Sequence, residues 1–422
     1  MSNFTNIKKC RLCNSKSIKS VFSLSSIPIP ETYQESKIIS KKSPRFPMTI
    51  IRCSDCHHVQ IKETINKKFL WKKYTYFSGQ TNAIKNHFKS LSQDFIKKFN
   101  LNNNDLILDV GSNDGTFLKF FKNKTKILGI DPSRTVGAYA NKINKVKTLI
   151  SFFNSASVTK IIKKFQKPKI ILAFNVFAHT PSMNDFVKNI KDLLDKNGVF
   201  IFEAQYLADI LKNKILGTFF HEHISHHSIY SLNKLFRFHD LKIINVLPAN
   251  IQKGSVIGFV THENNKNYKL SISVKRHLDY EKKNKINSVM KLIEFKNHIK
   301  QLKRTALKIT KKYKSIVAYG AARSGPTLLR NMGLENKIKH IFDDHPMKLG
   351  KFTPSSAIKI FKTSDLKKIK TDLCVITAYL HAKKIIKENI GLIKKGIDFM
   401  ILYPRPIIIN SKNYQIFLHE KN

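Results

Sequence analysis

Apolar runs of four to six residues alternate with polar, glycine-rich turns through the middle of the chain. The central example is Leu106–Val110, a buried strand pattern broken only by Asp109 and followed by the turn Gly111–Gly115 and a further apolar run. A second apolar run, Ile127–Ile130, follows after a short polar stretch. Strand, glycine turn and helix in this order form the ligand-binding unit of a doubly wound parallel sheet. The pattern predicts an α/β fold with a Rossmann-like domain here.

The same periodicity predicts the neighbouring elements. Helices are expected at 81–99, 183–194 and 231–239, and strands at 169–173, 198–203, 241–247 and 255–261. The charged segment 264–312 has apolar positions typical of helices that cap this domain and lead to another. A second strand–glycine–helix unit begins at 315–319 and continues through Gly320, a helix at 327–331 and a strand ending at Asp343. It predicts a second, C-terminal Rossmann-like domain.

The turn after the first strand indicates what the middle domain binds. Asp109 and Asp114 are acidic, which disfavours a phosphate and favours a cationic or hydroxyl-rich ligand. Asp131, at the tip of the second strand, is placed to bind both hydroxyls of a ribose. S-adenosylmethionine fits, having a ribose, an ammonium and a sulfonium but no phosphate. The alternative is a dinucleotide, although the GxGxxG pattern is absent. The predicted cofactor residues are Asp109, Gly111, Ser112, Asn113, Asp114, Gly115, Asp131, Pro132, Ser133 and Asn175.

Four of the five cysteines form two CxxC pairs near the N-terminus. Cys10 and Cys13 make the first pair, and Cys53 and Cys56 the second. Such pairs bind tetrahedral Zn²⁺ through four thiolates, a set that leaves no open position for catalysis. They predict a structural zinc site. The segments 25–30 and 44–47, rich in Ser and Pro, are expected to be loops of this zinc domain.

Composition limits the partners and the compartment. The chain has 422 residues and a net charge of +48, but its 76 lysines and arginines are scattered through every segment. The scatter favours compositional drift over a nucleic-acid surface, while a positive field would attract an anionic substrate. No run of ~18–20 apolar residues predicts a membrane span, and the N-terminus lacks a signal peptide's apolar core. A cytoplasmic protein without nucleic-acid or membrane partners is expected.

The segment 219–227 is the densest polar cluster, containing His221, Glu222 and His223. A metal site is one interpretation, but the i,i+4 spacing of HExxH is missing. A histidine base made more basic by a nearby carboxylate is another, and a solvated loop is the third. His179, after the strand 169–173, is either structural or a site residue. Tyr74 and Tyr76 either pack or face a pocket.

These features together resemble the sugar C-methyltransferase family. The resemblance covers nearly the whole chain. Its motifs are the four cysteines, Tyr74–Ser78, Val110–Thr116, Asp131–Ser133, Asn175–His179, His221–His223, Tyr319–Ala322, and Asp343 with Lys348 and Gly350. Two positions depart from the family pattern. Phe220 replaces a tyrosine, and the basic residue of the C-terminal turn is Arg323 rather than a lysine at position 324.

The resemblance implies methyl transfer from S-adenosylmethionine to a carbon of a nucleotide-linked deoxyketosugar. The alternatives are a nucleic-acid or other small-molecule methyltransferase, and a catalytically silent homologue that binds S-adenosylmethionine. It implies His223 as the base that forms an enolate, with Glu222, His179 and Tyr76 beside it. The expected substrate residues are Tyr74, His221, Gly320, Arg323, Asp343 and Lys348. The expected domains are a zinc domain at 1–70, a methyltransferase domain with helical extension at 71–300, and a nucleotide-sugar-binding domain at 301–422. A nucleotide-diphosphate sugar is the expected partner of a monomer or homodimer.

Overall fold

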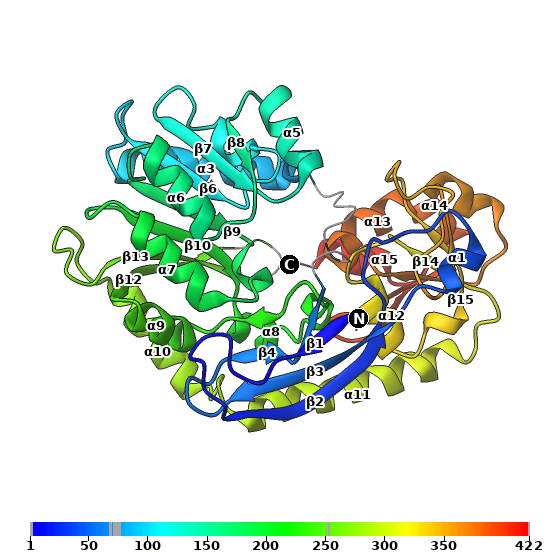
Figure 1. Ribbon diagram of the computed structural model, residues 1–422. Coiled ribbons are helices and arrows are strands. Elements are labelled where there is room, and N and C mark those ends of the chain that lie inside the picture. The colour runs from blue at the N-terminus through cyan, green and yellow to red at the C-terminus, as the bar shows by residue number, and fades with distance from the viewer. Residues whose placement is uncertain (1–2, 67–69, 71–76, 250, 252–253, 421–422) are drawn as a thin grey trace.

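The computed structural model describes residues 3–66, 70, 77–249, 251 and 254–420. The chain forms a β-rich N-terminal region followed by two α/β domains (Figure 1). None of the helices in this part of the chain is both long and apolar enough to cross a bilayer.

The N-terminal region is a small antiparallel sheet. Its strands are β2 (Ile18–Ile27), β3 (Phe46–Cys53) and β4 (Val59–Ile61). A two-stranded ribbon of β1 (Phe4–Asn6) and β5 (Glu63–Ile65) and the short helix α1 (Lys37–Lys41) accompany it. The loop prediction for 25–30 and 44–47 was wrong in part, because β2 extends to Ile27 and β3 begins at Phe46. Pro47 is tolerated in β3 because β4 pairs only with Ile50–Arg52, so no hydrogen bond to β4 is lost there.

A fourth strand completes that sheet from elsewhere in the chain. β11 (Ser225–His226) pairs antiparallel with β4, giving the order β11-β4-β3-β2. The backbone N–H of Ile61 also donates to the carbonyl of Ile224 at 2.9 Å. The polar cluster predicted at 219–227 is therefore joined to the N-terminal sheet.

The middle domain is a seven-stranded sheet in the order β12-β13-β10-β9-β6-β7-β8. Its strands are β6 (Leu106–Val110), β7 (Lys126–Asp131), β8 (Thr148–Ile150), β9 (Ile170–Phe174), β10 (Val199–Gln205), β12 (Leu241–Ala249) and β13 (Ser255–His262). Its helices are α3 (Asn82–Lys98), α4 (Thr116–Lys119), α5 (Arg134–Lys142), α6 (Ser155–Lys164), α7 (Met183–Leu193), α8 (Leu207–Lys212), α9 (Ile229–Phe238) and α10 (Ile272–Lys283). Strands β6 to β10 are parallel, and β13 is antiparallel to both of its neighbours. The carboxyl ends of the parallel strands β6 to β10 lie at the same edge of the sheet.

The C-terminal domain is a six-stranded sheet in the order β16-β15-β14-β17-β18-β19. Its strands are β14 (Ile316–Tyr319), β15 (Ile338–Phe342), β16 (Lys359–Phe361), β17 (Leu373–Ile376), β18 (Asp398–Ile401) and β19 (Ile407–Ile409). Its helices are α12 (Gly325–Asn331), α13 (Ala382–Glu388), α14 (Ile390–Lys394) and α15 (Tyr414–His419). The predicted second Rossmann-like domain is confirmed.

Helix α11 (Val289–Thr310) connects the middle and C-terminal sheets. It runs beneath β2, so the N-terminal sheet lies between the two larger domains (Figure 1). Phe295 of α11 packs against Phe22 of β2 and Phe219, with ring centroids 6.5 and 5.5 Å apart. The predicted domain boundary at residue 300 falls within this helix. The limits of the three domains stay a prediction.

Candidate active site

The four paired cysteines come together in the N-terminal region. Their sulfur atoms all lie within 4.8 Å of one another, and Cys10, Cys53 and Cys56 are buried. Cys10 and Cys56 are 3.5 Å apart, as are Cys13 and Cys53. Zn²⁺ bound tetrahedrally at about 2.3 Å from each sulfur would place the sulfurs about 3.8 Å apart. The cluster fits one zinc ion, and its four ligands leave no position for a substrate.

The glycine turn after β6 has the backbone expected of it. Gly111 adopts φ +73° and donates its N–H to the carbonyl of Ile130 at 2.8 Å. A Cβ at Gly111 would lie 2.5 Å from Cγ2 of Val176, which follows β9. Glycine is therefore required for packing against the neighbouring loop, a reason that the sequence did not reveal.

A short helical turn lies over this glycine turn. In η1 (Ser78–Gln80), the backbone N–H of Ser78 donates to Oδ1 of Asn113 and that of Gly79 donates to Oδ2 of Asp114, both at 2.9 Å. Tyr74 and Tyr76, which precede it, lie outside the described residues. Their predicted roles stay predictions.

Asp131 ends β7 and organises the loops around it. Its carboxylate accepts from the backbone N–H groups of Asn113 at 3.0 Å and Ser133 at 2.8 Å. Further lone pairs remain, since a carboxylate has about four acceptor sites. Burial raises the pKa of Asp131, and burial followed by the charge of Asp131 raises that of Asp109 well above its usual value.

Asp109, Asp114 and Asp131 form no ion pair with any described residue. Three buried carboxyl groups around one turn, with no cation of the described residues paired to them, fit a ligand that brings its own positive charge. The ammonium and sulfonium of S-adenosylmethionine meet that requirement.

Asn175 follows β9 and is held by residues that the sequence analysis missed. Its side-chain amide donates to Glu203 at 2.9 Å, and the other carboxylate oxygen of Glu203 lies 2.5 Å from Nε2 of His87. Asn175 has φ +58°, a left-handed conformation in which asparagine is tolerated. Glu203 lies two residues before the end of β10, so a carboxylate near the carboxyl end of a parallel strand was the available signal.

His223 and His179 meet at the edge of the middle sheet. Their ring centroids are 4.9 Å apart and nearly perpendicular. Nδ1 of His223 lies 3.0 Å from the carbonyl of Thr218, so this nitrogen carries the proton and Nε2 is an acceptor. Burial lowers the pKa of His223 well below its usual value, and burial lowers that of His179 to about 3. Both imidazoles are therefore neutral at neutral pH.

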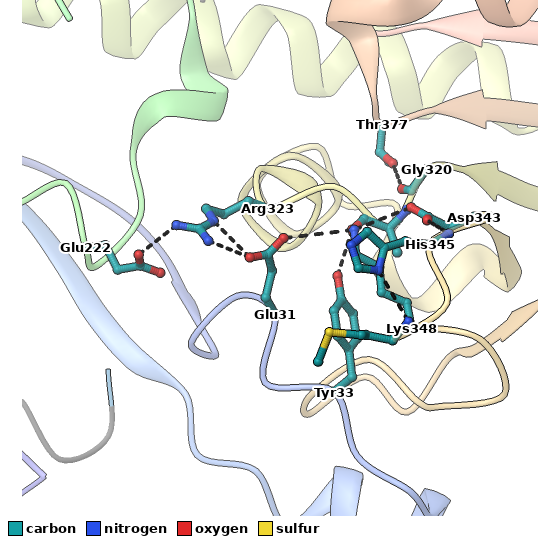
Figure 2. A network of polar contacts seen from close by, with 11 residues as sticks. Glu31, Tyr33, Glu222, Gly320, Arg323, Asp343, His345, Lys348 and Thr377 are labelled. Carbon is teal, nitrogen blue, oxygen red and sulfur yellow. Dashed lines mark hydrogen bonds and ion pairs between the residues drawn. The ribbon is translucent and has the colours of Figure 1, made fainter. Parts of the chain in front are cut away.

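Glu222 does not orient His223, contrary to the interpretation of a carboxylate–histidine pair. Its carboxylate accepts from Nη1 of Arg323, a C-terminal-domain residue, at 2.8 Å (Figure 2). His221 contacts the N-terminal region instead, with Nε2 3.0 Å from the carbonyl of Pro47. The three consecutive residues thus have three different partners. Among the described residues, Thr218 contacts Nδ1 of His223 through both its carbonyl, at 3.0 Å, and its hydroxyl, at 3.3 Å.

The remaining predicted substrate residues surround the turn after β14. Gly320 has φ +92°, and Asp343 accepts from the N–H of Ala321 at 2.8 Å. Nζ of Lys348 donates to the carbonyl of Ala321 at 2.9 Å and lies 3.6 Å from Asp343. The structure brings Gly320, Arg323, Asp343 and Lys348 together, and joins them to Glu222 through Arg323.

Comparisons with known families divide the chain into three parts. Residues 10–71 match the model described as "Putative zinc binding domain", residues 85–246 match "Methyltransferase domain", and residues 250–404 match "C-methyltransferase C-terminal domain". The chain is 25% identical to the C-methyltransferase NovU of Streptomyces niveus over 96% of its length and 98% of that protein.

Solved methyltransferases align with part of the chain. One is an S-adenosylmethionine-dependent methyltransferase of Clostridium acetobutylicum, with 13% identity and a TM-score of 0.36 over 44% of this chain and 93% of that one. Another is magnesium protoporphyrin IX methyltransferase of Synechocystis, with 15% identity and a TM-score of 0.33 over 42% and 83%. The assignment rests on the family models and on NovU. The three matching models and the similarity to NovU identify an S-adenosylmethionine-dependent C-methyltransferase, with a zinc-binding region, a methyltransferase domain and a C-methyltransferase C-terminal domain in that order.

Proposed function

We propose that the enzyme methylates a carbon beside the ketone of a nucleotide-linked deoxyketosugar, with His223 as the base. The observation that carries the proposal is the hydrogen bond from Nδ1 of His223 to the carbonyl of Thr218. It leaves Nε2 unprotonated and therefore able to accept a proton from carbon. The resemblance to sugar C-methyltransferases supplies the substrate class.

The chemistry places three demands on the chain. A base must remove the proton next to the ketone, a donor must stabilise the enolate oxygen, and the acceptor carbon must lie in line with the methyl group. Bound S-adenosylmethionine supplies an electrophilic methyl group on its sulfonium. His179 is proposed to contact the sugar oxygens, because its ring adjoins that of His223.

The contact between Arg323 and Glu222 supports a substrate that touches both large domains. Lys348 is the proposed cation for the diphosphate, Gly320 and Asp343 shape the turn that holds it, and Arg323 is proposed to contribute to the substrate site through its contact with Glu222. A cavity of about 20 Å³, lined by Glu31, Tyr33 and Gly320, has space for about one water. The nucleotide is therefore not proposed to enter this cavity.

The test replaces His223 with alanine. We expect S-adenosylmethionine to bind with unchanged affinity in calorimetry, while turnover falls by about 10²–10⁴-fold, the usual contribution of a general base. Deuterium exchange from solvent at the sugar carbon, measured without the methyl donor, should be lost as well. His262→Ala, at a half-buried histidine of β13, is the matched control and should keep both activities.

Exchange at the parental rate in His223→Ala would show that another group is the base. A protein that binds S-adenosylmethionine yet methylates no ketosugar would instead contradict the substrate class. Phe220, whose ring centroid is 4.0 Å from that of His223, bears on this second outcome. If a phenol is needed there, Phe220→Tyr should raise turnover.

A further inference from the structure

Glu31 belongs to the zinc-binding domain but lies at the junction of all three domains. It is located between β2 and α1, and its backbone has φ +60°. A residue other than glycine is uncommon in that conformation. Its Oε2 accepts from both Nε and Nη2 of Arg323, at 3.1 and 2.5 Å (Figure 2). The N-terminal region thus reaches the C-terminal turn.

A further hydrogen bond of Arg323 is directed to the methyl-transfer site. Its Nη1 donates to Glu222 at 2.8 Å. The guanidinium is planar and rigid, so fixing Nε and Nη2 on Glu31 also fixes the direction of Nη1. The side chain of Glu222 is 6% exposed, whereas those of Glu31 and Arg323 are 20% and 23% exposed. The two ion pairs, Arg323–Glu31 and Arg323–Glu222, therefore lie in a largely desolvated position.

Glu31 is itself held from its other side. Its Oε1 lies 3.9 Å from Nζ of Lys348, and that ammonium also faces Asp343 and the carbonyl of Ala321. Two residues further along, the hydroxyl of Tyr33 donates to the same carbonyl at 2.7 Å. Figure 2 shows these side chains in one continuous network from Glu222 to Lys348. The carboxylate of Glu31 is therefore a fixed support for Arg323.

We propose that Glu31 is a positioning residue of the methyl-transfer site, which holds the Arg323 guanidinium against Glu222 and so aligns the segment 221–223. The inference rests on the proposed function, because that function gives the segment its role. The zinc-binding domain then contributes to turnover directly, through the side chain of Glu31.

The negative charge of Glu31 also affects the pKa of Glu222. Burial raises the pKa of Glu222, Arg323 opposes that effect and the negative charge of Glu31 adds to it. His179 and His223 are neutral because burial lowers their pKa values. Tyr33 is neutral because burial raises its pKa, and Lys348 faces Glu31 at 3.9 Å. Removing the charge of Glu31 should therefore lower the pKa of Glu222. If turnover requires ionised Glu222, the acid limb of its pH profile should move to lower pH.

The experiment compares Glu31→Gln with Glu35→Gln in the full-length, zinc-loaded enzyme. Glu35 is a matched control, because it also connects the N-terminal region to the C-terminal domain, through Lys351 at 3.0 Å, but its side chain is 77% exposed. For Glu31→Gln we expect kcat to fall by about 10–100-fold, as for misplacement of a site by about 1 Å. The affinity for S-adenosylmethionine should stay unchanged, and the acid limb should move to lower pH. Glu35→Gln should match the parent enzyme in kcat, in affinity for S-adenosylmethionine and in the position of the acid limb.

Glu31→Asp keeps the charge but withdraws the carboxylate by one methylene group. It should lower kcat without moving the acid limb, and it serves as the test variant if Glu31→Gln does not fold. Parental kcat and pH profile in Glu31→Gln would overturn the proposal. A rise in turnover would also overturn it, since Glu31 would then compete with the substrate for Arg323.

A further measurement does not depend on the substrate class. Protein labelled with [5-¹³C]glutamate reports the titration of Glu222 by NMR, with Glu222→Gln used to assign the signal. The midpoint should be lower in Glu31→Gln and unchanged in Glu35→Gln. If the parent enzyme methylates no ketosugar, the proposed function fails, while an unshifted midpoint in Glu31→Gln overturns this inference.

Discussion

Replacing Gly111 with alanine tests why the turn after β6 requires glycine. Two costs are expected, and the structure separates them. The φ of +73° costs an L-residue about 1–2 kcal/mol. The new Cβ would also lie 2.5 Å from Cγ2 of Val176, and such overpacking costs about 1–3 kcal/mol. Gly111→Ala should therefore lower the free energy of unfolding by about 2–5 kcal/mol.

Gly350→Ala is the matched control. Gly350 has φ +76°, but a Cβ there would meet no atom within 4 Å. Gly350→Ala should therefore lower the free energy of unfolding only by the cost of the left-handed backbone, about 1–2 kcal/mol. The double variant Gly111→Ala/Val176→Ala removes the colliding methyl groups and should recover part of the difference.

Urea denaturation followed by circular dichroism measures all of these variants, and calorimetry measures their affinity for S-adenosylmethionine. Val176 adjoins Asn175, so Gly111→Ala should also weaken cofactor binding, and Gly350→Ala should not. Equal destabilisation by Gly111→Ala and Gly350→Ala would refute the steric argument. So would failure of Val176→Ala to recover any stability in the double variant.

Two further predictions concern the zinc site and acid stability. Metal analysis of the parent should give about one zinc per chain. Cys53→Ser should lower that content and destabilise the N-terminal sheet, whereas Cys374→Ser, at a buried cysteine outside the cluster, should keep it; full zinc content after loss of both Cys53 and Cys56 would contradict the site. Burial lowers the pKa of His226 to about 3 and of His227 to about 4, so the unfolded state takes up more protons below pH ~6.5. The free energy of unfolding should fall by up to about 1.4 kcal/mol per pH unit for each such histidine between about pH 6.5 and 4, and equal stability at pH 7 and 5 in urea titrations would contradict this.

The sequence predicted best what is local. Leu106–Val110 was recognised because a fully buried parallel strand is a nearly continuous apolar run, here interrupted only by Asp109 and followed by glycine. The carboxylates at Asp109 and Asp131 indicated the kind of ligand, because both lie at strand ends. The zinc cluster was recognised because its ligands are paired within four residues of one another.

What depends on contacts between distant segments could not be predicted. No local pattern distinguishes Glu31 from other surface glutamates, since its role follows from the fold that brings Arg323 to it. Thr218 likewise orients His223 through a backbone carbonyl, which any residue type offers. Strand β3 was missed near Pro47 because proline normally argues against a strand, and only the partial pairing with β4 removes the objection.

The strand β11 makes the order of synthesis matter for folding. β4 leaves the ribosome long before Ser225 and His226, the residues that complete its free edge. Until then the N-terminal sheet presents unpaired backbone groups, which can pair with another chain. A fragment ending before residue 225 would keep that edge permanently. We expect such a fragment to self-associate even when its four cysteines hold zinc, and the full-length chain to be protected once residues 225–226 are in place.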